Sequence, residues 1–219
     1  MTAVTIIDAD IGNLRSVQKA FERAGATATI SSRAEEVASA EALVLPGVGA
    51  FGDAMRKLNE RGLVTVLREQ VGARGKPLLG ICLGMQLLAR SSTEGGLHDG
   101  LGLIDAVVER MDVAESRDWA HKKLTLPHIG WNVAKAKAGS RLFDGIPTGA
   151  DFYFVHSYAV KANRDEDVAA TCEYGHEFAA AIESGNVLAT QFHPEKSHKD
   201  GYRLIENYLR ICAPGRVAA

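Results

Sequence analysis

The strongest constraint on the fold is an alternation of short apolar runs and helical patterns over the first 91 residues. Residues 4–8, 27–30, 42–45 and 77–81 have the length and the apolar or β-branched content of buried strands. Helices are expected between them at 13–24, 35–40 and 53–73, with a break near Gly62, and after them at 83–91. Alternating strands and helices predict a parallel sheet covered by helices on both faces.

After Gly96 the pattern changes to short strands joined by glycine, asparagine and aspartate turns. Strands are expected at residues 103–110, 124–127, 131–135, 152–155, 158–160, 168–173, 178–183 and 187–192. An amphipathic helix is expected at 199–212, and the polar stretch 114–123 is expected to be an exposed loop. These patterns predict hairpins with antiparallel or mixed pairing. One α/β domain over residues 1–219, with a β-rich insertion, accounts for the whole chain.

The composition narrows the class of protein. Hydrophobic residues make up 46% and charged residues 24% of 219 residues, as in ordinary soluble globular proteins. The formal net charge of −2 gives no reason to expect a nucleic-acid partner, and neither a signal peptide nor a membrane span is visible. Cys82, Cys172 and Cys212 are too widely spaced for a disulfide framework or a zinc pattern. We therefore expect a cytoplasmic protein, with Cys172 and Cys212 in its core.

Cys82 stands where a predicted strand turns into a helix, within the sequence GICLG. Ligands of α/β sheets bind at the carboxyl ends of strands, and a helix N-terminus can lower a cysteine pKa below about 8.5. Gly80 and Gly84 are expected to permit a sharp turn, which makes this the cysteine form of a nucleophile elbow. The turn would aim the N–H of Leu83 at an oxyanion. A buried structural cysteine at a helix start is an equally good interpretation of this motif alone.

A base for that thiol is offered by TQFHPEKS at 190–197. Pro194 favours an extended conformation at His193, so His193 and Glu195 should point the same way. Glu195 would then accept a hydrogen bond from one imidazole nitrogen and leave the other facing Cys82. Taken alone, the pair is more often a surface His–Glu pair at a strand end.

A third element is the glycine-rich stretch LPGVGAFGDA at 45–54. Its G-x-G-x-x-G spacing does not follow the first strand, and no lysine supports a phosphate, so a dinucleotide site is the weaker interpretation. We expect a loop that brings the N–H of Val48 to the thiol as a second oxyanion donor. The histidines show no spacing typical of a metal site. His156 is expected in the core or a pocket wall, and His128 is expected to be structural or adjacent to the site. The remaining histidines outside the triad, His98, His121, His176 and His198, are expected to be solvated.

These three motifs occur in the order PGVGAFG, GICLGMQ and HPE, and together they resemble the class I, triad-type glutamine amidotransferases. The stretches DADIGNL, EGGLHDGLGLI, PHIGWN and FYFVHSY are similar to the glutaminase subunits of imidazole glycerol phosphate synthases. The resemblance covers essentially the whole chain, although 114–123 is longer than the family leads us to expect. It implies a three-layer α/β fold on a mixed, mostly parallel sheet with a flavodoxin-like core.

The resemblance also implies a reaction and a partner. Glutamine would be hydrolysed to glutamate and ammonia without a cofactor or metal. The ammonia would pass to a separate (β/α)₈-barrel cyclase subunit, with which the chain forms a heterodimer. There it would help to make imidazole glycerol phosphate and aminoimidazole carboxamide ribotide, a step of histidine biosynthesis.

Carried over by position, the resemblance assigns Cys82 as nucleophile, His193 as the proton carrier and Glu195 as the group that orients it. Val48 and Leu83 would supply oxyanion donors. The expected substrate contacts are Gly49, Gln86, Glu94, Ser157 and Tyr158. The expected partner contacts are Asn13, Trp131, Tyr153 and Lys196.

Three other functions remain open from the sequence. The chain could serve another synthase, such as those for anthranilate or pyridoxal phosphate, although DIGNL and PHIGWN argue against this. It could be a non-enzymatic flavodoxin-like binding module in which the thiol is inert. It could also be a thiol hydrolase or protease that acts on other acyl groups without a partner.

Overall fold

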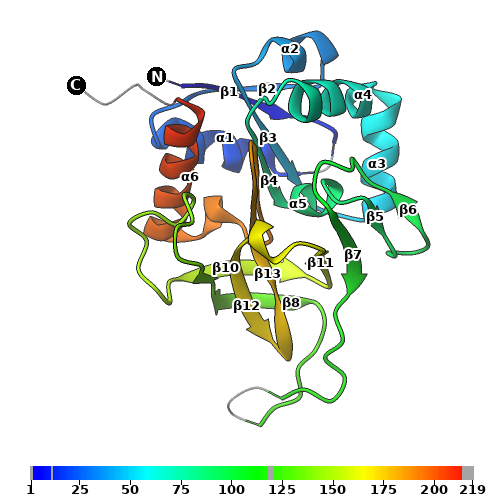
Figure 1. Cartoon of the computed structure of the whole chain (residues 1–219), viewed down its shortest axis with the longest axis vertical. Helices are drawn as coiled ribbons and strands as arrows, with labels where there is room; N and C mark the ends of the chain where they lie inside the picture. Colours follow the sequence, from blue (N-terminus) through cyan, green and yellow to red (C-terminus); the bar gives the residue numbers. More distant parts are fainter. Residues whose placement is uncertain (1, 11, 118–120, 214–219) are drawn as a thin grey trace.

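The computed structural model describes residues 2–10, 12–117 and 121–213. Within them an eight-stranded sheet runs in the order β2-β1-β3-β4-β14-β13-β12-β9 (Figure 1). The first five strands in that order are parallel, and the last three continue in antiparallel pairs. The strands are β1 (Ala3–Ile7), β2 (Thr27–Ser31), β3 (Ala42–Gly47), β4 (Leu78–Cys82), β9 (Lys135–Ala136), β12 (Val168–Tyr174), β13 (His176–Ser184) and β14 (Val187–Thr190). The predicted mixed, mostly parallel sheet is confirmed.

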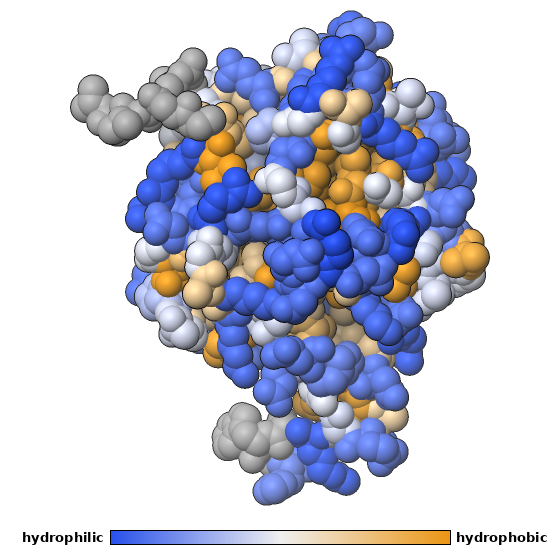
Figure 2. All heavy atoms as spheres, in the orientation of Figure 1, coloured by the Kyte–Doolittle hydropathy of each residue, from blue (hydrophilic) through white to orange (hydrophobic). Residues whose placement is uncertain are grey.

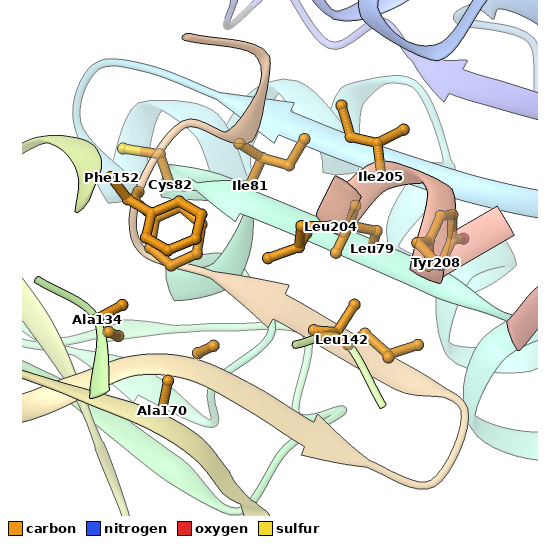
Figure 3. Close-up of a cluster of buried hydrophobic side chains, with 14 of the residues drawn as sticks. Leu79, Ile81, Cys82, Ala134, Leu142, Phe152, Ala170, Leu204, Ile205 and Tyr208 are labelled. Atoms are coloured by element: carbon orange, nitrogen blue, oxygen red, sulfur yellow. The ribbon is translucent and has the colours of Figure 1, made fainter. Parts of the chain in front are cut away.

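Helices cover both faces of this sheet because its buried strands are apolar on both sides. On β3, Val44 belongs to one core cluster, whereas Leu43 and Leu45 belong to the other. The first cluster includes side chains of α1 (Leu14–Arg23) and α6 (His198–Cys212). Figure 3 shows Leu204, Ile205 and Tyr208 of α6 near Leu79 and Ile81 of β4. The second cluster takes in α2 (Ala34–Ser39), α3 (Phe51–Glu60), α4 (Leu63–Leu67) and α5 (Leu83–Leu87). The predicted three layers are therefore present.

The strands outside the large sheet form two smaller sheets beside the carboxyl ends of the parallel strands (Figure 1). One has the order β11-β7-β5-β6, with β5 (Ser91–Ser92), β6 (His98–Asp99), β7 (Ala106–Arg110) and β11 (Tyr158–Ala162). The other pairs β8 (His128–Val133) with β10 (Asp151–His156). Their register places His128 opposite His156 and Trp131 opposite Tyr153. These sheets supply walls for the end of β4, where the candidate site lies.

Several predicted boundaries were wrong. The helix expected at 83–91 ends at Leu87, because Arg90 N–H donates to the carbonyl of Ala106 and pulls the chain into the small sheet. The strand expected at 124–127 is absent, since Pro127 has no N–H to give to a ladder and pairing begins at His128. The strand expected at 131–135 is instead the end of β8 followed by β9. The strand expected at 103–110 begins only at Ala106.

The break near Gly62 is confirmed, because that residue adopts a left-handed conformation between α3 and α4. The expected 53–73 helix then finishes as a π-helix, η1 (Arg68–Ala73), which the spacing had not predicted. Cys172 is fully buried in the core, as predicted, whereas Cys212 is half-buried and packs against the edge of that core. Burial raises the pKa of the Cys172 thiol to about 12 and that of Cys212 to about 11.

The loop between β7 and β8 extends away from the body at the lower end of Figure 1. Its described residues in 114–123 are mostly exposed, as predicted, and 118–120 lie outside the described part. Figure 2 shows that hydrophilic side chains cover most of the visible face. Among the helices in the described part of the chain, each is too short or too polar to cross a membrane.

Candidate active site

Cys82 occupies a sharp elbow between β4 and α5. Its φ of 55° and ψ of −110° are strained for a residue with a side chain. Gly80 and Gly84 were predicted to permit the sharp turn, but Cys82 itself adopts the positive φ. The two glycines instead permit close packing around the elbow. A Cβ atom on Gly84 would lie 1.7 Å from the Leu45 carbonyl oxygen, and one on Gly80 would meet Gly84 at 3.0 Å. The elbow can therefore press against β3 only without those side chains.

His193 and Glu195 lie together beside the elbow. His193 is extended and follows β14, but Pro194–Lys196 forms a 3₁₀ turn, η3. The predicted extended path is thus correct for His193 only. The turn brings Glu195 Oε1 to 2.8 Å from His193 Nδ1 and leaves the other imidazole nitrogen for Cys82. The structure therefore brings Cys82, His193 and Glu195 together, as the sequence analysis expected.

The surroundings favour a charged imidazole. Burial alone lowers the pKa of His193, but hydrogen bonds and charge from Cys82 and Glu195 outweigh it and raise the pKa to about 9. The Glu195 side chain is 4% exposed, and within the described residues its Oε2 has no hydrogen-bond partner. A buried carboxylate with one partner interacts strongly with that partner's positive charge. The geometry can therefore hold an imidazolium beside a thiolate.

A cavity of about 260 Å³ opens over the thiol. This is at the small end of ligand sites and suits a molecule of amino-acid size. Every residue predicted as an oxyanion donor or substrate contact lines it: Val48, Gly49, Leu83, Gln86, Glu94, Ser157 and Tyr158. Its other lining residues are Cys82, Pro127, Val155, His156, His193 and Lys196. The cavity thus draws on the loop after β3, the elbow, the loop between β5 and β6, and the turn between β10 and β11.

The glycine-rich loop is held by Glu94 and His98. Glu94 Oε2 accepts a hydrogen bond from the N–H of Phe51 at 2.8 Å, at the start of α3. His98 packs so closely that a Cβ on Gly52 would lie 2.7 Å from its ring. His98 is half-buried, so the prediction that it is solvated is only partly correct. Gly49 has a φ of 106°, which suits glycine and allows the loop to turn over the cavity.

Gln86 lies one turn into α5 and is 5% exposed. Its Nε2 donates to the Tyr158 carbonyl at 2.8 Å and to Gln191 Oε1 at 3.1 Å. Both N–H groups are thereby used within the protein. Gln86 can then address a ligand only through its side-chain oxygen.

A buried histidine pair supports the turn that carries Ser157 and Tyr158. His156 Nδ1 lies 2.9 Å from the Tyr158 carbonyl, which can only accept, so this nitrogen carries the proton. His156 Nε2 is then the acceptor for His128 Nδ1 at 3.0 Å. Burial lowers the pKa of His156 to about 3 and that of His128 to about 4. Both rings are neutral donors and acceptors, in keeping with the predicted pocket-wall and site-adjacent positions.

Beside the cavity lies an aromatic patch, which we define as Trp131, Tyr153 and His198. Trp131 is 47% exposed and stacks on His198 at 4.7 Å between ring centroids. The ring of Tyr153 meets Trp131 edge-on, and Lys196 Nζ lies 5.7 Å from the Tyr153 ring. Three of the four predicted partner contacts therefore cluster together.

Asn13, the fourth predicted partner contact, is not part of this cluster. It caps α1 by accepting a hydrogen bond from Ser16 N at 3.4 Å, and it lines a separate hollow of about 780 Å³. Among the described residues, no group of three potential ligands is arranged to hold a metal ion.

Gln191 was not among the predicted site residues, although it is fully buried and its Nε2 lies 3.8 Å from the Cys82 sulfur. A signal was available, because Gln191 precedes His193 by two residues and extended chain points such residues to the same side. Val155 was missed as well. Its carbonyl lies 3.7 Å from Cys82 Sγ.

Fold and site together define a class of protein. Residues 5–211 match the model of the family described as glutamine amidotransferase class-I. A solved structure described as a glutamine amidotransferase has a TM-score of 0.71 at 24% identity, covering 95% of this chain and 98% of its own. The chain therefore belongs to the class I glutamine amidotransferase family.

More similar relatives narrow the assignment. One from Rhodopirellula baltica, named imidazole glycerol phosphate synthase subunit HisH, is 48% identical and covers 98% of this chain and 100% of its own. A relative of the same name from Moorella thermoacetica is 46% identical, over 95% of this chain and 94% of its own length. Within the amidotransferases, this chain groups with the HisH subunits.

Proposed function

We propose that this chain hydrolyses the side-chain amide of glutamine, as the glutaminase subunit of imidazole glycerol phosphate synthase in histidine biosynthesis. The observation that carries the proposal is the strained Cys82 elbow beside the buried His193–Glu195 pair. Strain at a residue with a side chain is typical of functional positions. A raised histidine pKa next to a thiol is typical of nucleophilic cysteines.

The triad divides the reaction into two steps. The Cys82 thiolate attacks the amide carbon of glutamine, and the imidazolium of His193 gives its proton to the departing nitrogen, which leaves as ammonia. A water molecule then attacks the thioester while neutral His193 takes its proton. Glutamate leaves, and the thiolate and imidazolium are restored. Glu195 stabilises the imidazolium and fixes the ring orientation through the 2.8 Å contact.

The oxyanion formed in each step needs hydrogen-bond donors. Leu83 is the first residue of α5, where backbone N–H groups have no partner within the helix. Val48 lines the same cavity from the loop after β3. We assign their N–H groups to the oxyanion, where one such donor typically contributes about 2.7–4 kcal/mol to the transition state.

Recognition of the amino acid falls to polar groups around the cavity. Gln86 has only its oxygen to offer and would accept a hydrogen bond from the α-ammonium group. Glu94 lines the cavity with one oxygen already bound to Phe51, and its charge favours the same ammonium group. Gly49, Ser157 and Tyr158 would contact the remainder of the substrate.

The partner would be the (β/α)₈-barrel cyclase subunit, bound in a heterodimer. The aromatic patch supports this assignment, because exposed aromatic side chains are enriched at protein interfaces. Lys196 lines the cavity and also approaches Tyr153, so the patch adjoins the catalytic centre. Docking there would let ammonia pass between subunits without protonation. We assign the reaction to the cytoplasm, because the free Cys82 thiol stays reduced there.

A diazoketone analogue of glutamine tests the nucleophile directly. Mass spectrometry should find one equivalent bound at Cys82, and excess glutamine should slow the labelling. Cys212→Ala should label like the wild type, because it removes a thiol outside the cavity. Labelling that persists in Cys82→Ala would reject Cys82 as the nucleophile.

A further inference from the structure

Gln191 is a buried polar residue that the triad chemistry leaves unexplained. It follows β14, its side chain is fully buried, and its Nε2 lies 3.8 Å from Cys82 Sγ. Burial of an amide costs free energy unless its donors and acceptors are satisfied. The sulfur is therefore one of the partners that keep this amide in place.

The orientation of the Gln191 amide is dictated by its neighbours. The Tyr158 carbonyl can only accept, and it receives hydrogen bonds from His156 Nδ1 and Gln86 Nε2. Gln86 therefore turns its NH₂ group inward, and its second N–H meets Gln191 Oε1. With its oxygen engaged there, Gln191 must turn its own NH₂ group toward Cys82.

We propose that Gln191 is a further catalytic residue, whose side-chain N–H donates to the Cys82 sulfur and stabilises its thiolate form. The inference rests on the proposed role of Cys82 as nucleophile. A hydrogen bond to an anion is stronger than one to a neutral group, so this contact favours thiolate over thiol.

The need for such a donor follows from the elbow itself. α5 has five residues, so the dipole of a longer helix is not available to the thiolate. The Val155 carbonyl, 3.7 Å from the sulfur, can accept from a thiol but repels a thiolate. The Gln191 N–H offsets that repulsion, because it approaches the same sulfur to 3.8 Å as a donor.

The sulfur also lies within reach of other titratable groups. His193 stands beside it with Glu195 behind, and the same cavity is lined by Glu94, His156, Tyr158 and Lys196. None of these groups is removed when Gln191 alone is changed.

The test is the pH dependence of alkylation of Cys82 by iodoacetamide in the full chain, followed site by site with mass spectrometry. Gln191→Met removes the donor, and Gln191→Asn keeps an amide but withdraws it by one methylene. Each should raise the midpoint of the alkylation rate against pH by about one pH unit or more, which corresponds to a roughly tenfold slower reaction at pH values below both midpoints. Gln70→Met is the matched control, because Gln70 is a buried glutamine that does not line the cavity.

A midpoint for Gln191→Met or Gln191→Asn equal to that of the wild type, with thermal unfolding showing a folded chain, would overturn the inference. A Cys82 that is inert at every pH in the wild type would instead overturn the proposed nucleophile, and this inference with it.

Discussion

The close approach between the elbow and β3 makes Gly84→Ala a severe substitution. A Cβ at this position would lie 1.7 Å from the Leu45 carbonyl oxygen, whereas real contacts are essentially never under 3.0 Å. The two segments would have to separate by about 1.3 Å, the difference between these distances. Both sides are backbone within the central sheet and its elbow, so no flexible side chain can absorb the shift. Overpacking costs about 1–3 kcal/mol in typical cores, and we expect about 3 kcal/mol or more here.

For a chain of this length, such a loss lowers Tm by roughly 6–12 °C. Movement of about 1 Å at the thiol should also slow glutamine hydrolysis about 10²-fold. Thermal unfolding and glutamate release in the presence of the liganded cyclase measure the two effects. Gly72→Ala is the control, because its Cβ would meet only the end of the Leu103 side chain, at 3.3 Å. If Gly84→Ala matched this control in Tm and rate, the close-packed elbow would not be a requirement of the fold.

Three further predictions address charge and docking. In Glu195→Gln the pKa of His193 should fall, because the buried negative charge beside the imidazole is removed. The alkaline limb of the plot of kcat/KM against pH should therefore shift to lower pH by about one pH unit or more. An unshifted limb would contradict the role of Glu195. Burial lowers the pKa of His156 to about 3, so below about pH 6.5 the unfolded chain takes up a proton that the folded chain does not. The contribution of His156 to folding stability is therefore complete above about pH 6.5 and is lost as the pH falls. In urea unfolding, His156 should lower the free energy of unfolding by about 2 kcal/mol at about pH 5 relative to about pH 7. The His156→Gln variant should lose less stability than the wild type over the same pH range; an equal loss would contradict this assignment. Trp131→Ala should weaken cyclase binding by about 2 kcal/mol in calorimetry while leaving Tm within a few degrees; unchanged affinity would move the interface elsewhere.

The central sheet could be predicted because its signals are local. Buried strands such as β3 and β4 are short, continuous apolar runs with helical spacing between them, and each pattern is set by neighbouring residues. Cys82, His193 and Glu195 could be nominated because each lies in a short local motif, but neither motif was decisive by itself and the family resemblance was needed to join them. The small sheets were less predictable, because pairing over long distances ends α5 early at Leu87.

The hydrogen bonds around the sulfur depend on contacts that the sequence does not encode locally. Gln191 meets Gln86 and Cys82 across 105 and 109 positions. His128 meets His156 because the β8–β10 register places them opposite each other. A shift of one residue in that register would point one ring to the other face of the sheet. Side-chain alternation can nominate such residues, but only the fold selects their partners.

The proposed function requires Cys82 to hydrolyse glutamine for a cyclase partner. The most direct measurement is glutamate release from glutamine by the wild-type chain and by Cys82→Ala, each with and without the cyclase subunit bound to its nucleotide ligand. We predict slow release by the isolated wild type, faster release with the liganded cyclase, and none above background from Cys82→Ala in either case. Equal release with and without the cyclase, or release that persists in Cys82→Ala, would contradict the account.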